Sequence, residues 1–415
     1  MNSRLISIYE DTSYKLDFTR EEIEELLSLK KVIGKNNLKL EADGGFMVSH
    51  YVGFLATKKI KLQVLPKILN LNSNIYERNY ELENKAISLL FNMMNYCEYL
   101  EVRELPDERE VNELNGDILE IFISIFNKSL LEKLKKGINK SYVEKEENSI
   151  FIKGKILVSE TKRKNSYREH FHYLRYEEFT PNNLLNRIFK TVAIKLLSIS
   201  KNKANIRQLR FIIETLNEAD IINITKDTFK NIKFNRLNNQ FQKPFRLAEI
   251  LFFSAMPGLY NGNRDTYSFL IQVNQLYERF LYKWINNELK KRQEYEVFYQ
   301  KPQRYLVAED EMFLLKPDIT INKGKAVRFI IDAKYKNINK KISQNDIYQM
   351  ITYAIRYNCE NIYLVYPKML DSDSKSAVIN EYAIKSELLK KEIKIRICIF
   401  DLFDYKKEKV ENYIS

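Results

Sequence analysis

The chain has 415 residues, a hydrophobic fraction of 45% and a formal net charge of +13 at pH 7. This length is enough for two or three domains with their own cores, and the apolar content is typical of a globular protein rather than a disordered one. No apolar stretch reaches the roughly 18 residues that a membrane span needs, and the first residues lack the basic start and apolar run of a secretion signal. We therefore expect a cytoplasmic protein without membrane contact.

Charge and cysteine content narrow the function less than the apolar pattern does. The 68 Lys and Arg residues exceed the 55 Asp and Glu residues, which suits a polyanionic partner such as nucleic acid. A composition rich in Lys and Asn explains the same charge without any partner, so charge alone decides little. Cys97, Cys359 and Cys398 share no paired spacing, which is typical of reduced core thiols and argues against a zinc site.

Residues 1–80 are predicted to form a β-rich unit. Residues 3–18 indicate one or two strands, and Thr19 and Glu22 have the spacing of a capping box at the start of a helix. Three further strands are expected at residues 38–43, 45–57 and 58–68.

Residues 81–264 are predicted to be mostly helical. Helical periodicity is found at residues 85–99, 116–136, 182–200, 204–217 and 234–259. Residues 141–158 resemble a hairpin with a charged tip at residues 144–148. A basic, aromatic stretch follows at residues 162–175 and includes His170 and His172, which lack a third ligand for a metal. This stretch is either a contact for nucleic acid or protein, or a plain solvated loop.

Residues 265–415 are predicted to form a C-terminal domain with a mixed sheet flanked by helices. Its expected elements are a helix over residues 269–291, strands over 294–307, 311–322, 326–336, 361–366 and 393–400, and a helix around residues 346–356. A turn at residues 322–325 makes a hairpin that brings Asp318 within a residue or two of Asp332.

The strand that follows this turn carries the candidate chemistry. Because side chains alternate along a strand, Asp332 and Lys334 lie on one face and Ala333 on the other. Asp318 and Asp332, together with the Ala333 carbonyl and water, offer the hard oxygen ligands that Mg²⁺ prefers. Such a metal activates water and stabilises a scissile phosphate, while Lys334 orients the nucleophile or stabilises the transition state. The pattern thus favours phosphodiester hydrolysis.

The next helix and the first helix of the domain add three candidates. Gln349 and Tyr353 are four residues apart and share a helix face, so both can point toward the metal site or a DNA strand. Glu278 either adds a further carboxylate or is a surface residue paired with Arg279 or Lys283.

The tripeptide acid-x-Lys is weak evidence on its own. It also occurs at residues 83–85, 160–162, 288–290, 373–375, 392–394 and 404–406. A salt-bridged hairpin in a Lys-rich protein is therefore the alternative for residues 318–334. The ordered set of Asp318, Asp332, Lys334, Gln349 and Tyr353 is what favours an active site.

These residues resemble the PD-(D/E)xK nuclease superfamily, with Pro317-Asp318, Asp332-Ala333-Lys334 and a Gln349-x-x-x-Tyr353 element as in its RecB-like branch. Most of the chain also resembles the McrC family, the nuclease subunits of McrBC-type modification-dependent restriction systems. The shared segments are residues 64–68 (VLPKI), 152–156 (IKGKI), 176–180 (YEEFT) with Asn182, Asn183 and Asn186, and 276–280 (LYERF). Family members often carry a bulkier or hydroxylated residue at the position of Ala333.

The resemblance implies a DNA endonuclease subunit that uses Mg²⁺, with Mn²⁺ as a substitute, and binds Mg²⁺ through Asp318, Asp332 and the Ala333 carbonyl, with Glu278 as a further candidate. It also implies a partner, a hexameric AAA+ GTPase of the McrB kind, whose pore is entered by the first half of the chain and whose GTP hydrolysis is stimulated, and modified double-stranded DNA as substrate. The candidate pore-entering elements are residues 141–158 and 162–175. The chain has no Walker A sequence and is not the motor itself. The alternatives are a standalone repair nuclease of the same superfamily and an inactive adaptor with a nuclease fold.

Overall fold

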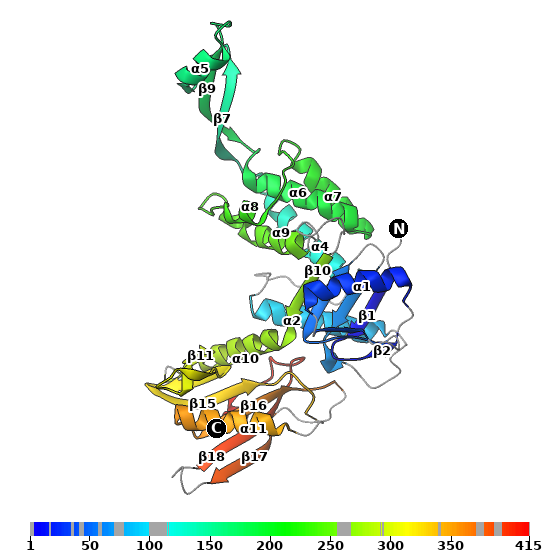
Figure 1. The fold of residues 1–415 in the computed structure, drawn as a ribbon, viewed down its shortest axis with the longest axis vertical. Coiled ribbons are helices and arrows are strands. Elements are labelled where there is room, and N and C mark those ends of the chain that lie inside the picture. Colours follow the sequence, from blue (N-terminus) through cyan, green and yellow to red (C-terminus); the bar gives the residue numbers. More distant parts are fainter. Residues whose placement is uncertain are drawn as a thin grey trace. The chain divides into compact units, whose positions relative to one another are not determined.

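The computed structural model divides the chain into two compact units, residues 1–118 with 256–415, and residues 119–255 (Figure 1). We expected three domains with boundaries after residues 80 and 264, whereas the structure joins the first and last parts of the chain in one unit. The described residues are 4–15, 18–34, 37–40, 45–56, 60–69, 79–98, 114, 116–254, 267–290, 292, 294–338, 342–370, 377–385 and 392–414.

The first sheet of the larger unit combines strands from both ends of the chain. Its order is β1 (Arg4–Tyr9), β6 (Ile60–Leu65), β5 (Tyr51–Ala56) and β10 (Tyr267–Gln272). A Cβ atom at Gly53 would lie 2.0 Å from the Phe269 backbone oxygen, so the close approach of β10 to β5 requires glycine there. The single helix expected over residues 269–291 is therefore wrong in its first part, because pairing with β5 holds β10 extended and helix α10 (Val273–Leu289) begins after it.

A small second sheet and two helices complete the N-terminal part. The sheet has the order β2 (Tyr14–Lys15), β4 (Gly45–Val48) and β3 (Leu38–Leu40), and the helices are α1 (Arg20–Ile33) and α2 (Tyr80–Tyr96). The capping box of Thr19 and Glu22 is confirmed. The single strand expected over residues 45–57 is divided into β4 and β5, because His50 has a φ of 65° and breaks the extended chain. Helix α2 begins before residue 85, because the Asn79 side chain accepts a hydrogen bond from the Leu82 amide.

Six strands form the mixed sheet of the C-terminal part. Their order is β11 (Glu296–Tyr299), β14 (Ile319–Lys323), β15 (Ala326–Ala333), β16 (Asn361–Pro367), β18 (Glu392–Phe400) and β17 (Ala377–Lys385). The three central strands β15, β16 and β18 are parallel, and the remaining pairs are antiparallel. This confirms the expected mixed α/β class. The sequence did not indicate β17.

The strands expected over residues 294–307 and 311–322 are each divided in two. The first expected strand becomes β11 and β12 (Arg304–Val307), and the second becomes β13 (Met312–Leu315) and β14. Strands β12 and β13 pair with each other in a separate hairpin, while β11 and β14 join the main sheet. Asp318 lies between β13 and β14, where the chain passes from the hairpin into the sheet.

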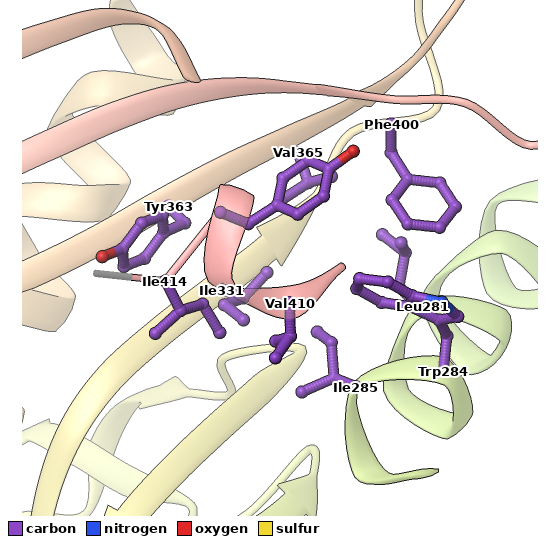
Figure 2. Close-up of a pocket in the computed structure, with 10 residues that line it drawn as sticks. Leu281, Trp284, Ile285, Ile331, Tyr363, Val365, Phe400, Val410 and Ile414 are labelled. Atoms are coloured by element: carbon purple, nitrogen blue, oxygen red, sulfur yellow. The ribbon is translucent and has the colours of Figure 1, made fainter. Parts of the chain in front are cut away.

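Helices α10 and α11 (Gln344–Tyr357) cover opposite faces of this sheet. Alternate residues of the strands, such as Ile330 and Ile362, pack with Met350 and Ala354 of α11. The residues between them on the strands, such as Ile331 and Tyr363, face α10, and Figure 2 shows this packing. The side chains in Figure 2 are Leu281, Trp284, Ile285, Ile331, Tyr363, Val365, Phe400, Val410, Tyr413 and Ile414. Because side chains alternate along a strand, the two helices enclose two separate apolar layers.

The smaller unit contains the helices that the periodicity predicted. They are α4 (Ile118–Leu134), α6 (Leu184–Ile199), α7 (Lys203–Thr215) and α9 (Gln242–Ser254), with a short α8 (Lys226–Lys230) and the 3-10 helix η2 (Asn239–Phe241). Helix α9 begins later than the expected span of residues 234–259, since η2 and a turn precede it, and residues 255–259 lie outside the described part of the chain.

A three-stranded sheet extends away from these helices within the smaller unit (Figure 1). It consists of β7 (Ser141–Ser149), β9 (His172–Thr180) and β8 (Lys155–Ile156), with helix α5 (Val158–Lys164) after β8. We call residues 141–180 the finger. The hairpin expected at residues 141–158, with its tip at 144–148, is wrong, because these charged residues lie inside β7 and pair with β9 along its whole length.

Opposite charges also face each other across the two paired strands. Glu146 of β7 contacts Arg175 of β9 at 2.6 Å, and Lys145 contacts Glu178 at 3.1 Å. The chain turns later, near Gly154, which has a φ of 67° and is so close to β9 that a Cβ atom would lie 2.4 Å from the Arg175 backbone oxygen. The basic stretch at residues 162–175 is correspondingly not one loop, since it includes the end of α5 and the start of β9.

Within the described parts of the chain, no helix combines the length and apolarity needed to cross a membrane. Cys97, Cys359 and Cys398 are buried and free, as expected for core thiols.

Candidate active site

The hairpin of β14 and β15 places two carboxylates opposite each other. Ile319 pairs with Ile331, so Asp318 and Asp332 lie at the same end of the two strands, as the turn between them predicted. The Ala333 amide donates a hydrogen bond of 2.9 Å to Asp318 Oδ2. Asp332 is only 2% exposed although it carries an ionisable group. A buried carboxylate of this kind requires a counter-charge or a proton.

Lys334 follows β15 directly and supplies that counter-charge. Its amide donates to the Val365 carbonyl at 2.9 Å, so the parallel strand β16 fixes its backbone. Its Nζ lies 2.5 Å from Asp332 Oδ2 and donates to Gln349 Oε1 at 3.1 Å. Asp332 and Lys334 therefore meet on one side of the strand, as alternation predicted.

Helix α11 continues this chain of contacts. Gln349 Nε2 donates to the Tyr353 hydroxyl at 2.9 Å, and that hydroxyl donates to the Lys316 carbonyl at 3.2 Å. Because they are four residues apart, both side chains point toward the end of β15. Their hydrogen bonds connect the Lys334 ammonium to the Lys316 carbonyl, two residues before Asp318.

Glu278 of α10 lies at the same site. Its Oε2 accepts a hydrogen bond of 3.2 Å from the side-chain Nε2 of Gln300. The backbone amide of Gln300 donates to the backbone carbonyl of Asp318 at 2.8 Å. Of the two residues considered as surface partners of Glu278, Lys283 instead pairs with Glu98 at 2.6 Å. The structure therefore places Glu278 beside the carboxylates rather than in a surface ion pair with Lys283.

Burial, and after it neighbouring carboxylates, disfavours the ionisation of the carboxyl groups at the site. Burial, the Asp332 carboxylate and the Glu278 carboxylate raise the pKa of Asp318 to about 8. Burial also raises the pKa of Asp332, although Lys334 opposes the rise, and burial with the Asp332 charge raises the pKa of Glu278. Burial lowers the pKa of Lys334, but Asp332 and then Asp346 raise it by more. With its pKa raised to about 8, the Asp318 carboxyl holds a proton at neutral pH, while the ion pair with Lys334 favours the ionised form of Asp332.

These residues fit a hard divalent cation in chemistry but are not arranged around one. Within the described residues, no three or more His, Cys, Asp or Glu side chains are grouped as metal ligands. The reason is visible at each carboxylate, since Asp318 accepts from the Ala333 amide and Asp332 is paired with Lys334. Apart from that ion pair, Asp332 Oδ2 has no hydrogen-bond partner in the described structure. Three carboxylates whose pKa is raised by burial and by neighbouring carboxylates are the oxygen donors that Mg²⁺ prefers.

Two further charged residues belong to the site and were not predicted there. Asp346 lies in the first turn of α11, with Oδ1 at 3.8 Å from Lys334 Nζ and Oδ2 at 2.5 Å from Lys336 Nζ. Its position three residues before Gln349, on the same helix face, is the sequence signal that could have indicated it.

The residue after Lys334 contacts the N-terminal sheet. Tyr335 is buried beside Glu10, which follows β1, and the Lys67 ammonium lies 5.1 Å from the centre of the Tyr335 ring. Burial raises the pKa of Glu10 to about 8, although Lys67 opposes the rise. No local sequence pattern indicated this contact, because it joins residues more than 300 positions apart.

Comparisons with known proteins identify the family of the chain. The family model for the McrBC 5-methylcytosine restriction system component matches residues 47–367, a range that includes the Asp318, Asp332, Lys334, Gln349 and Tyr353 set. The Type IV methyl-directed restriction enzyme EcoKMcrBC of Escherichia coli K12 is 24% identical over 271 residues, which are 61% of this chain and 77% of that protein.

Two solved assemblies from Thermococcus gammatolerans share the fold. A half-complex from a tetradecameric assembly of McrB AAA+ hexamers with bound McrC has a chain that aligns with a TM-score of 0.73 at 22% identity, covering 96% of this chain and 94% of that one. A McrBC complex has one that aligns with a TM-score of 0.52 at 23% identity, covering 69% of this chain and 88% of that one. With the family model matched over most of its length, the chain belongs to the family of McrBC 5-methylcytosine restriction system components.

Proposed function

We propose that this chain is the DNA-cleaving subunit of a McrBC-like restriction complex, a Mg²⁺-dependent endodeoxyribonuclease whose C-terminal sheet is a PD-(D/E)xK domain. The observation that carries the proposal is the meeting of Asp318, Asp332 and Lys334 at the end of β15. Membership of the family and the likeness to chains of McrBC assemblies support it.

The proposed metal ligands are Asp318, Asp332 and the Ala333 carbonyl, with Glu278 as a further carboxylate. Bound there, Mg²⁺ would supply Lewis-acid stabilisation of the scissile phosphate and activation of the attacking water, and Mn²⁺ would serve in its place.

The chain's own residues have separate tasks in this proposal. Lys334 brings a positive charge to the phosphate and orients the attacking water. Gln349 holds the Lys334 ammonium by its amide oxygen, and Tyr353 fixes the Gln349 side chain against the Lys316 carbonyl. Because these hydrogen bonds form one series, the lysine is held in place before substrate arrives.

The proposed partner is a McrB-like AAA+ GTPase hexamer, and the proposed substrate is modified double-stranded DNA. Support comes from the solved assembly named for McrB AAA+ hexamers with bound McrC, which aligns over nearly the whole chain. The finger replaces the hairpin of residues 141–158 as the candidate pore-entering element. It presents Ile150, Phe151 and Ile152 to solvent, with Phe151 81% exposed, and exposed apolar side chains of this kind mark partner-binding surfaces.

Cleavage assays with and without the partner test this function. The purified chain is mixed with methylated plasmid DNA and Mg²⁺, alone or with the McrB-like protein and GTP. We expect cleavage that requires both additions and disappears when EDTA removes the metal. Strong cleavage by the chain alone would favour a standalone nuclease, and no cleavage under any condition would favour an inactive adaptor.

A further inference from the structure

If the proposed function holds, Asp332 has to bind a divalent cation with the carboxylate that now pairs with Lys334. Its Oδ2 is 2.5 Å from the Lys334 ammonium, with both side chains mostly buried. A divalent cation at the same oxygen would repel that ammonium, so one positive charge has to leave. Metal binding and the Lys334–Asp332 ion pair therefore compete.

The displaced ammonium needs another negative partner nearby. The Lys334 side chain is 18% exposed, and a charge at that depth is costly without a counter-charge. Gln349 holds Nζ by a hydrogen bond but carries no charge. Asp346 Oδ1 is 3.8 Å from the same Nζ, and its side chain is 13% exposed. A small movement of the ammonium would turn this longer contact into a full ion pair.

Asp346 is itself held in position for that role. It lies in the first turn of α11, where the helix dipole favours a carboxylate, and its amide bonds to the Ser343 carbonyl at 3.0 Å. Its other oxygen, Oδ2, is occupied by the more exposed Lys336 at 2.5 Å. Oδ1 is thus the atom that faces Lys334.

We propose that Asp346 is a positioning residue that receives the Lys334 ammonium when a divalent cation takes Asp332. The inference rests on the proposed function and deepens it, because it assigns to Asp346 a role in metal loading without making it a metal ligand. The exchange leaves Lys334 charged and directed at the site, between Asp346 and Gln349.

The test is a double-mutant cycle on metal affinity, measured by titration calorimetry of Mn²⁺ into the full-length chain without DNA. Asp346→Asn removes the carboxylate that would receive the Lys334 ammonium, so the ammonium stays on Asp332 and competes with the metal. We therefore expect Mn²⁺ affinity to fall by about tenfold. In the Lys334→Met background, where no ammonium competes, the same substitution should change affinity by less than about twofold. Glu294→Gln, which removes a carboxylate paired with Lys323 elsewhere, is the matched control and should leave affinity unchanged.

Each other outcome is decisive. An equal loss in both backgrounds would make Asp346 a metal ligand, and no loss in either would remove its role; both overturn the inference and leave the proposed function intact. A parent chain that binds no Mn²⁺ overturns both.

A second variant keeps the inference testable should Asp346→Asn lose its thermal unfolding transition. Lys336→Met frees Asp346 from its competing partner, and Mn²⁺ affinity should then rise in the parent background but not beside Lys334→Met. Unchanged or lowered affinity in the parent background would contradict the proposal.

Discussion

The site at the end of β15 and the finger use charge in opposite ways. At the site, Asp332 is buried and Asp318 is half-buried, and burial together with neighbouring carboxylates raises the pKa of both. In the finger, charges are exposed and some are paired across β7 and β9, while Ile150, Phe151 and Ile152 expose apolar side chains. Burial at the site shifts the pKa values of groups that can bind a metal, whereas exposure in the finger leaves apolar side chains open to contact with a partner protein. We therefore expect the site to determine chemistry and the finger to determine association.

The largest expected effect comes from removing the cation of the site. Lys334→Met should lower DNA cleavage by the assembled complex about 10²–10³-fold, because the transition state loses a positioned positive charge. The matched control is Lys323→Met, which breaks an exposed pair with Glu294 on the same sheet. Its cleavage rate should equal that of the parent. Equal DNA cleavage rates for the two variants would show that the buried Lys334 contributes no more to cleavage than the exposed Lys323.

The next effect should separate association from chemistry at the finger. Replacing Ile150 and Phe151 together by Ser removes the exposed apolar side chains, so binding to the McrB-like partner should weaken by about tenfold or more and GTPase stimulation should fall. Mn²⁺ affinity should not change. The control is Ile221→Ser, which removes an apolar side chain of the same unit that is 63% exposed. Loss of stimulation by the control alone would place the partner surface elsewhere in the unit.

A smaller effect should follow from pH at the site. The pKa of Asp318 is raised from 3.8 to about 8, so at pH 6–7 a cation must displace a proton. Mn²⁺ affinity should rise by up to about tenfold per pH unit and level off above pH 8. By the same linkage the contribution of Asp318 to the stability of the metal-free fold should be complete below pH 3.8 and be lost as pH rises toward 8, since the unfolded chain releases this proton first. Affinity that is flat between pH 6 and 8 would show that Asp318 is already ionised.

The smallest effect is expected from an exposed ion pair of the finger. Glu146→Gln breaks the contact with Arg175, but solvent already screens that pair, so the melting temperature and GTPase stimulation should stay close to those of the parent. A large drop in melting temperature would mean that charge pairing, rather than strand pairing, holds β7 on β9.

Local patterns predicted most of the site geometry and little of the finger. Asp318 and Asp332 are joined by a short hairpin, and Gln349 and Tyr353 by one helical turn, so their proximity follows from strand register and helix spacing. Their catalytic roles stay predictions. The partner of β7 is β9, more than 20 residues away, and the charged run inside β7 resembled a turn because its counter-charges lie on that distant strand.

Contacts between residues far apart in the sequence could not be predicted from local sequence patterns. β10 resembled a helix start but pairs with β5, and Glu10 packs on Tyr335, since both contacts join opposite ends of the chain. Asp346 was placed on the correct helix without a role, because only the structure shows Lys334 and Lys336 on either side of it.

The most direct test of the account is the Asp332→Ala variant in the reconstituted complex with the McrB-like partner, GTP, Mg²⁺ and methylated DNA. DNA cleavage and GTP hydrolysis are measured in the same reaction. We expect cleavage to fall to background while stimulated GTP hydrolysis stays at the parent rate, because the substitution removes a site carboxylate and leaves the finger intact. A variant that cuts DNA as well as the parent would contradict the assignment of the active site.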